Sequence, residues 1–348
     1  MRSYLKPDPA FYGMPFESDS FNSMPYLYLG RTGCRVSKVG LGTFKFGHPE
    51  TGDGSFVDQK AAFKILDRAV ELGVTFWDTA NRYNASSGNS ERVLGQWFRA
   101  NPEIRRDIVI ATKLFGLMDG RTPNHCRLGR INIMEAVHAS LERLQCDHID
   151  ILFFHLFDPL TPIEESLEAV QELIERDLIR YLGVHNFTVE QLETYENYAL
   201  QGYPSIAAVE NIYNVLEGDE IVKSPDVLKY CARSGKSYIG WGPLAHGIVS
   251  NRYLDLGKLD ETDRLARSEI FKAKMVPANR EKLRQLADLG RDEGLEINQL
   301  ALAWMLTRPG MGPVIPAAYT VEQLESNAMA GALELSEEQA GRVARILS

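Results

Sequence analysis

Short apolar runs alternate with longer amphipathic stretches from Val39 to the end of the chain. Runs of this kind, rich in Val, Ile and aromatic residues and followed by polar loops, predict parallel strands that are buried on both faces. They follow one another at residues 39–44, 74–78, 107–113, 149–155, 179–186, 206–211, 237–241 and 313–316.

The stretches between these runs have the period of an amphipathic helix. In residues 58–73, five apolar side chains share one helical face: Ala62, Ile65, Leu66, Ala69 and Val70. The same period predicts helices over residues 90–100, 131–144, 162–177, 188–199, 297–308 and 320–330.

Repeated units of strand and then helix predict one α/β domain, a (β/α)8 TIM barrel over residues 25–348. Within it, residues 25–38 form two β-prone runs around a glycine-containing turn, which predicts a β-hairpin ahead of the barrel. Residues 1–24 lack periodicity and are interpreted as an N-terminal arm, and extra helices are expected near 279–293 and 336–347. The alternative is a doubly wound open sheet, which requires a phosphate-binding glycine turn after the first strand. The segment VGLGTFK is not such a turn.

Composition narrows the class of protein. The 348 residues are 44% hydrophobic and 24% charged, with a net charge of −9. This acidic balance argues against nucleic acid or an anionic membrane as a partner, and no apolar run has the length of a spanning helix. The four cysteines form no CxxC pair, so we expect neither a disulfide framework nor a metal site, and we expect a cytoplasmic protein.

Titratable residues stand at the ends of three apolar runs or just after them: Asp78, Tyr83, Lys113 and His155. In a barrel, the C-terminal ends of the strands face the active-site mouth. Each residue alone has an ordinary structural explanation, as a helix cap, a packing ring, a solvated ammonium or a core histidine. Together they are hard to explain by packing, because a buried lysine is costly unless it is paired, and Asp78 is a natural counter-ion for Lys113. The set predicts proton donation by a phenol whose pKa an adjacent ammonium lowers.

With these residues in place, the sequence resembles the aldo-keto reductase superfamily from about Leu27 to the C-terminus. The matching stretches are GLGTF (40–44), FWDTANRYNASSGNSERVLGQWF (76–98), IVIATK (108–113), HIDILFFHLFDP (148–159), IRYLGVHNF (179–187), WGPLAHGIVS (241–250) and VIPAAYTVEQLESNAMA (314–330). The resemblance implies a barrel that binds NADP(H) without a Rossmann fold and transfers a hydride between nicotinamide and a carbonyl. By position, it implies that Tyr83 is the general acid and that His155 orients the carbonyl. Lys113 then lowers the phenol pKa, and Asp78 holds Lys113.

The resemblance also implies where the cofactor lies. Its expected contacts are Gly42, Thr43, Phe44, Asp78, His185, Asn186, Glu210, Trp241, Gly242, Pro243, Leu244, Ala245, Gly247, Arg252, Ile315, Pro316, Ala317, Tyr319, Gln323, Ser326 and Asn327. Several positions depart from the family pattern: the usual Ser-Asn pair is His185–Asn186, and the usual Gln is Glu210. Ala317 and Gln323 stand where many members have cations for the 2′-phosphate. We therefore expect a modest preference for NADP(H), with NAD(H) as the alternative cofactor.

Two interpretations of Glu210 stay open. In the first, an ionised Glu210 lies near the nicotinamide ring and strengthens binding of the oxidised cofactor relative to the reduced one. Only a protonated His185 would offset the charge of Glu210. In the second, His185 and Glu210 pair with each other, so the charge of Glu210 has little effect on the nicotinamide ring.

The substrate is expected to be a small carbonyl or alcohol compound: an aldehyde, a ketone or a sugar-like molecule. Its expected contacts, besides Tyr83 and His155, are the rings of Phe44, Phe115, Phe157 and Trp241. Residues 114–130 add Arg121, His125, Arg127 and Arg130, which are interpreted either as a site for an anionic substrate or as a solvated basic face.

Two other functions compete with a reductase. The same fold serves as the cofactor-binding β subunit of voltage-gated potassium channels, which WGPLAHGIVS also resembles. An intact Asp-Tyr-Lys-His set, and the absence of a long inactivation-type arm, favour an enzyme. A barrel hydrolase without a cofactor is the third alternative.

Overall fold

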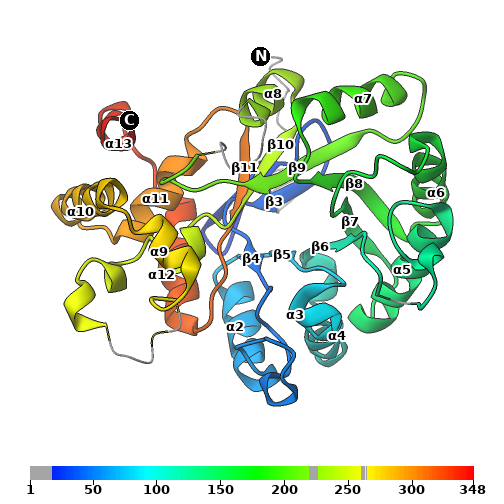
Figure 1. Ribbon diagram of the computed structural model, residues 1–348, viewed down its shortest axis with the longest axis horizontal. Coiled ribbons are helices and arrows are strands. Elements are labelled where there is room, and N and C mark those ends of the chain that lie inside the picture. Colours follow the sequence, from blue (N-terminus) through cyan, green and yellow to red (C-terminus); the bar gives the residue numbers. More distant parts are fainter. Residues whose placement is uncertain (1–17, 119, 219–225, 260–262, 264) are drawn as a thin grey trace, which may run out of the picture.

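Eight parallel strands form the centre of the molecule (Figure 1). The computed structural model describes residues 18–118, 120–218, 226–259, 263 and 265–348. The strands pair in chain order: β4 (Leu41–Gly42), β5 (Phe76–Asp78), β6 (Val109–Leu114), β7 (Ile149–Phe154), β8 (Ile179–His185), β9 (Ile206–Ile212), β10 (Ser237–Trp241) and β11 (Met311–Ile315).

Backbone hydrogen bonds between the first and last strands close the sheet into a barrel. Gly40 N donates to Val314 O (2.8 Å) and Gly42 N donates to Pro316 O (3.1 Å). A Cβ at Gly42 would lie only 3.2 Å from the Ile315 carbonyl oxygen, so the close approach of these strands favours glycine there. The predicted (β/α)8 barrel is confirmed, and the open-sheet alternative is wrong.

Helices cover the outside of the barrel (Figure 1). They are α2 (Gln59–Glu71), α3 (Tyr83–Ser86), α4 (Asn89–Ala100), α5 (Arg130–Leu144), α6 (Ile163–Glu175), α7 (Val189–Ala199), α8 (Val227–Ser234), α9 (Glu269–Lys274), α10 (Pro277–Asp292), α11 (Ile297–Leu306), α12 (Val321–Ala332) and α13 (Glu337–Leu347).

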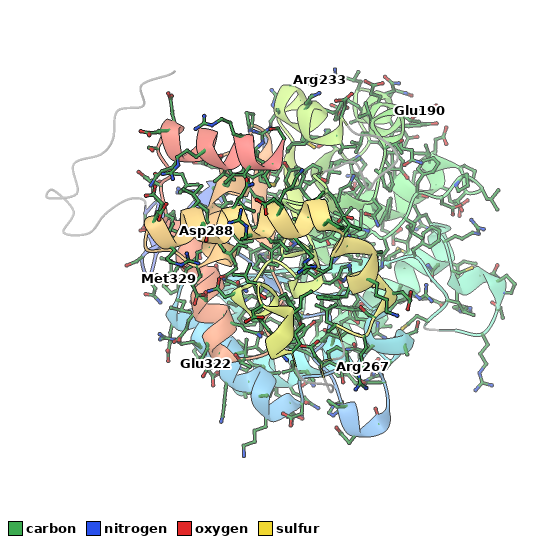
Figure 2. The ribbon with its side chains drawn as sticks, turned by 60° about the vertical axis from the view of Figure 1, so that its left-hand side comes forward. Glu190, Arg233, Arg267, Asp288, Glu322 and Met329 are labelled. Carbon is green, nitrogen blue, oxygen red and sulfur yellow. The ribbon has the colours of Figure 1, made fainter. Side chains whose placement is uncertain are left out.

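The predicted helices are all present, including the two extra ones, α10 and α13, which pack against each other on one flank (Figure 2). The apolar face of α2 is buried as expected at Ala62, Ile65, Leu66 and Ala69, while Val70 is half-buried. Sequence reasoning missed α3, α8 and α9, which span only four to eight residues and carry little periodic signal. In the described residues, no helix combines the length and the apolar character needed to cross a membrane.

A small antiparallel sheet closes the N-terminal end of the barrel. The predicted hairpin is present as β2 (Met24–Tyr28) and β3 (Arg35–Ser37). A third strand, β1 (Ser20–Phe21), pairs with β2 inside the segment interpreted as an arm, whose residues 1–17 lie outside the described part. Leu29 and Val36 are fully buried with the side chains of the barrel interior. Because this end is covered, the C-terminal end of the barrel is left for a site.

Candidate active site

Alternation along the strands aims several polar side chains into the C-terminal end of the barrel. Residues two apart on a strand share a face. The interior core includes Phe76, Ala111, Phe153, Ala208 and Ile239. Two residues further along each strand stand Asp78, Lys113, His155, Glu210 and Trp241. The same register that fills the interior with apolar side chains therefore collects these groups above it.

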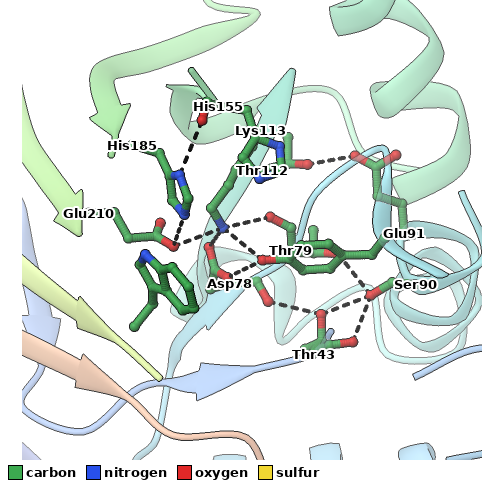
Figure 3. A network of polar contacts seen from close by, with 12 residues as sticks. Thr43, Asp78, Thr79, Ser90, Glu91, Thr112, Lys113, His155, His185 and Glu210 are labelled. Carbon is green, nitrogen blue, oxygen red and sulfur yellow. Dashed lines mark hydrogen bonds and ion pairs between the residues drawn. The ribbon is translucent and has the colours of Figure 1, made fainter. Parts of the chain in front are cut away.

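Lys113 is the hub of the resulting network (Figure 3). Its side chain is fully buried and its ammonium donates to the Asp78 carboxylate, to Thr79 O (3.1 Å) and to the Tyr83 hydroxyl (3.1 Å). Its Nζ also lies 3.2 Å from Glu210 Oε1. The predicted Asp78–Lys113 pair is therefore present, with a second carboxyl group that the sequence did not place beside it.

A left-handed turn holds Tyr83 over this network. Asn84, Ala85 and Ser86 all have positive φ angles, 56°, 56° and 60°, which are unfavourable for non-glycine residues. Asn84 Nδ2 donates to Phe46 O (2.7 Å) and ties the turn down. The Tyr83 hydroxyl then donates to Asp78 Oδ2 (3.1 Å) while it accepts from Lys113. Strain stored next to a functional group is a common feature of active sites.

A buried polar layer supports Asp78 from behind. The Thr43 hydroxyl donates to Asp78 O (2.9 Å) and contacts the Ser90 hydroxyl, so this predicted cofactor residue also positions Asp78. On the outer face of β6, Thr112 donates to Glu91 (2.6 Å), which also accepts from Arg143 (2.6 Å). Sequence reasoning missed this layer. Polar residues on the core-facing side of α4 were the available signal.

Burial and charge decide the protonation of these groups. Although burial opposes it, the Asp78 and Glu210 carboxylates raise the pKa of Lys113, which keeps the ammonium charged. Burial raises the pKa of Asp78, and burial together with the Asp78 charge raises the pKa of Glu210 well above its ordinary value. Burial and the Asp78 charge also raise the pKa of Tyr83 well above 10, although Lys113 opposes them. The expectation that the phenol pKa is lowered is therefore wrong for this arrangement.

Two histidines lie beside the network in the neutral form. Burial, with the charges of Lys113 and Arg82, lowers the pKa of His155 to about 3. Burial and the neighbouring His155 and Lys113 lower the pKa of His185 well below its usual value, so the protonated His185 considered from the sequence is wrong. His185 Nδ1 lies 3.1 Å from the His155 carbonyl oxygen, and its Nε2 lies 3.7 Å from Glu210 Oε1.

Some of the predicted cofactor residues lie beside this network. Trp241 stacks on the His185 ring (5.6 Å between centroids, 16° between planes) and donates to Asn186 Oδ1 (3.2 Å). After β10, Gly242, Ala245 and Gly247 have positive φ angles, within the predicted segment that also holds Pro243 and Leu244. The predicted Arg252 forms an ion pair with Asp263 (2.7 Å).

The residues predicted to contact the adenosine have polar partners in the described part of the chain. Gln323 Oε1 accepts from Tyr319 N (2.8 Å), and Asn327 donates to Ala317 O (3.5 Å). Ser326 donates to the Glu296 carboxylate. Ser326 Oγ also accepts from the side-chain amides of Asn298 (2.9 Å) and Gln299 (3.3 Å), and Asn327 Oδ1 accepts from Asn298 (3.0 Å). The modest cofactor preference expected from the uncharged Ala317 and Gln323 stays a prediction.

Charges in residues 114–130 are largely paired within the protein. Arg127 pairs with Asp158 (3.1 Å), His125 Nε2 lies 2.8 Å from Glu135, and Arg130 pairs with Glu172. These contacts favour the solvated basic face over the anionic-substrate site.

The predicted aromatic contacts for a substrate divide into two groups. Phe44 is 46% exposed and lies edge-on to Tyr83 (4.9 Å between centroids), at the mouth. Phe157 instead packs on Phe187 and Tyr195, and Phe115 is packed against the main core.

One buried atom tests whether a nicotinamide fits here. Glu210 Oε2 is buried, and no described residue donates a hydrogen bond to it. It lies at the position where the family pattern places a Gln that binds the carboxamide. A carboxamide NH2 is a donor that would satisfy this acceptor, so the residues present fit the group.

Comparison with known proteins agrees with this geometry. The model of the Aldo/keto reductase family matches residues 38–348. The chain is 31% identical to "Aldo-keto reductase AFTS1" of Alternaria alternata, over 93% of this chain and 92% of that protein. It is 30% identical to "Versiconal hemiacetal acetate reductase" of Aspergillus parasiticus (84% and 88%) and 29% identical to "Probable voltage-gated potassium channel subunit beta" of Oryza sativa subsp. japonica (87% and 90%). On its fold, its site and these matches, the chain belongs to the aldo/keto reductase family.

Proposed function

We propose that this enzyme is an NADP(H)-dependent oxidoreductase that transfers a hydride between nicotinamide and an aldehyde, a ketone or a sugar-like carbonyl or alcohol. The observation that carries the proposal is the contact of the Tyr83 hydroxyl with both the buried Lys113 ammonium and the Asp78 carboxylate. A phenol held between a fixed cation and a fixed anion is oriented to pass a proton to a carbonyl oxygen.

In the proposed reaction, each residue has one task. Tyr83 donates the proton to the carbonyl oxygen. Its raised pKa keeps the phenol protonated at neutral pH, which suits the reductive direction. Lys113 stabilises the phenolate that forms, and Asp78 holds Lys113 in place.

The neutral His155 donates a hydrogen bond that orients the carbonyl, and its low pKa keeps its charge constant through the cycle. Asn186, Glu210 and Trp241 would hold the nicotinamide, together with the other predicted cofactor residues. When bound, the nicotinamide supplies or accepts the hydride.

We also propose that the enzyme prefers NADP(H), modestly, and acts in the cytoplasm. The family generally uses this cofactor, whereas the missing cations around Gln323 limit the preference. The cysteines, which are all free, support a reducing compartment.

A parallel assay tests the function. Aldehydes, ketosteroids and ketosugars are offered with NADPH and with NADH, and cofactor binding is titrated separately. Turnover of any carbonyl with either cofactor supports the proposal. Tight cofactor binding without turnover would contradict it in favour of a cofactor-binding regulatory subunit, the second candidate that the Oryza relative suggests. Failure to bind either cofactor would contradict both.

A further inference from the structure

The catalytic network contains two buried carboxyl groups but one ammonium. Asp78 and Glu210 are 2% and 1% exposed, and Lys113 contacts both. If both carboxyls were ionised, the network would carry a net negative charge on buried side chains. Such a charge is costly, and proteins usually remove it by binding a proton.

The groups that face Glu210 come from five elements, and they limit where the proton can be. They are Asp78 at the end of β5, Tyr83 on α3, Lys113 on β6, His155 after β7 and His185 on β8. Burial and nearby charge keep both histidines neutral. Lys113 is charged and the Tyr83 phenol is neutral, so the proton belongs to one of the two carboxyl groups.

Hydrogen bonding separates the two carboxyl groups. Asp78 accepts from both the Lys113 ammonium and the Tyr83 hydroxyl, which stabilises its ionised form. Glu210 Oε1 lies 3.2 Å from Lys113 Nζ, and the Glu210 side chain also makes a hydrogen bond with Asp78 that raises the pKa of Glu210, while its Oε2 accepts no hydrogen bond from the described residues. An ionised carboxylate with a buried, unsatisfied oxygen is much less favourable than the neutral acid.

The neighbouring histidine also favours a protonated Glu210. His185 Nδ1 faces the carbonyl oxygen of His155 at 3.1 Å, so this nitrogen must carry the hydrogen. In the neutral ring, Nε2 then presents a lone pair, 3.7 Å from Glu210 Oε1. At 3.7 Å the two atoms do not form a hydrogen bond, but a carboxylate would face that lone pair with negative charge, whereas the neutral acid would not.

We infer that Glu210 is a fifth, positioning member of the catalytic network: it holds a proton at neutral pH and thereby leaves the Lys113 charge to act on Asp78 and Tyr83. The inference rests on the proposed function for its catalytic consequence, though not for the proton itself. Glu210 acts through Lys113, not on the reacting atoms.

Ionisation of Glu210 at alkaline pH would work against the phenolate. Glu210 Oε1 and the Tyr83 oxygen lie 3.2 and 3.1 Å from the same Lys113 nitrogen, so they are at most about 6 Å apart. At an effective dielectric constant of ~20, a charge at that distance raises the pKa of the phenol by about two. Alcohol oxidation needs the phenolate as its base, so in the wild type this direction should require a higher pH than in Glu210→Gln.

The proton itself is tested by infrared spectroscopy of the whole protein, without cofactor. A protonated carboxylic acid has a carbonyl stretch separate from that of a carboxylate. At neutral pH, we expect this band in the wild type, an isotope shift when glutamate side chains are carbon-13 labelled, and its loss in Glu210→Gln. The matched control is Glu164→Gln, the same substitution at an exposed residue whose carboxyl pKa is lowered by its own backbone amide and the Tyr198 hydroxyl. It should leave the band in place.

A band that persists in Glu210→Gln, or no isotope-shifted band in the labelled wild type, would overturn the inference. The labelled wild type alone gives this answer if the variant does not fold.

The catalytic consequence is read from pH profiles of alcohol oxidation. Whatever its absolute rate, the variant's activity should begin to rise with pH about two pH units earlier than that of the wild type. Glu210→Asp, which keeps a titrating carboxyl, should follow the wild type.

Coincident profiles for wild type and Glu210→Gln would contradict the positioning role even where the infrared band is present. Absence of any turnover in the wild type would instead count against the proposed function, and the infrared result would still decide the proton.

Discussion

The hydroxyl of Tyr83 is the group on which the proposed chemistry depends most directly. It lies 3.1 Å from Lys113 Nζ and 3.1 Å from Asp78 Oδ2, and the ring packs edge-on against Phe44. Tyr83→Phe removes one oxygen atom and keeps this packing. We expect turnover to fall by roughly 10²–10⁴-fold, the usual contribution of one general acid, which corresponds to about 3–5 kcal/mol of activation free energy.

Stability should change much less than turnover. Lys113 contacts Asp78 directly, so this ion pair stays intact when the Tyr83 hydroxyl is removed. Loss of the hydroxyl's own hydrogen bonds should lower the free energy of unfolding by about 1–3 kcal/mol. Cofactor affinity, measured by fluorescence titration, should stay close to that of the wild type.

Tyr238→Phe is the matched control. Its hydroxyl donates to Ile212 O (2.9 Å) inside the same barrel, and the variant loses the same atom outside the Lys113 network. Steady-state assays with a carbonyl substrate and NADPH should find normal turnover in this control. A Tyr83→Phe enzyme that keeps a near-wild-type kcat would refute the assignment, and one that no longer binds cofactor would show that Tyr83 is structural.

The remaining predictions concern the cofactor, acid stability and the supporting layer. Because Gln323 stands where a cation is usual, kcat/KM for NADPH should exceed that for NADH by only about tenfold to a hundredfold, the contribution of one hydrogen bond to a charged group; a clear preference for NADH would contradict this. If Glu210 is neutral, Glu210→Gln should leave the ratio of oxidised to reduced cofactor affinity unchanged at pH 7, and a large change would restore the ionised interpretation. Burial holds the pKa of His155 near 3, against ~6.5 when unfolded, so the unfolded chain binds the extra proton and stability falls as pH falls between these values. In urea titrations, the free energy of unfolding should change by up to about 1.4 kcal/mol per pH unit because of His155, and His155→Gln should make this pH dependence smaller. Glu91→Gln leaves the Arg143 charge buried and should cost about 3–5 kcal/mol in the same assay, and a loss below 1 kcal/mol would mean that the pair is not structural.

Local patterns predicted much of the fold and the residues of the proposed catalytic network. The apolar runs and helical periods predicted the strands and most helices because burial on a strand or helix face repeats at a fixed spacing along the chain. The same alternation that buries Phe76 and Ala111 aims Asp78 and Lys113 into the mouth. Residue types at the strand ends were therefore enough to predict that Asp78 and Lys113 meet, but not that Glu210 joins them.

Tertiary structure decided what those groups do to one another. The strand β4 is two residues long, and hydrogen bonds from Gly40 and Gly42 to the far end of the chain are what close the barrel. Closure buries Tyr83 beside Asp78 and brings Glu210 Oε1 to 3.2 Å from Lys113, and burial with the Asp78 charge turns the expected lowering of the Tyr83 pKa into a rise. Sequence alone determined the residues and their order along the strands. Their distances and burial, on which every electrostatic interaction depends, exist only once segments far apart in the chain have packed together.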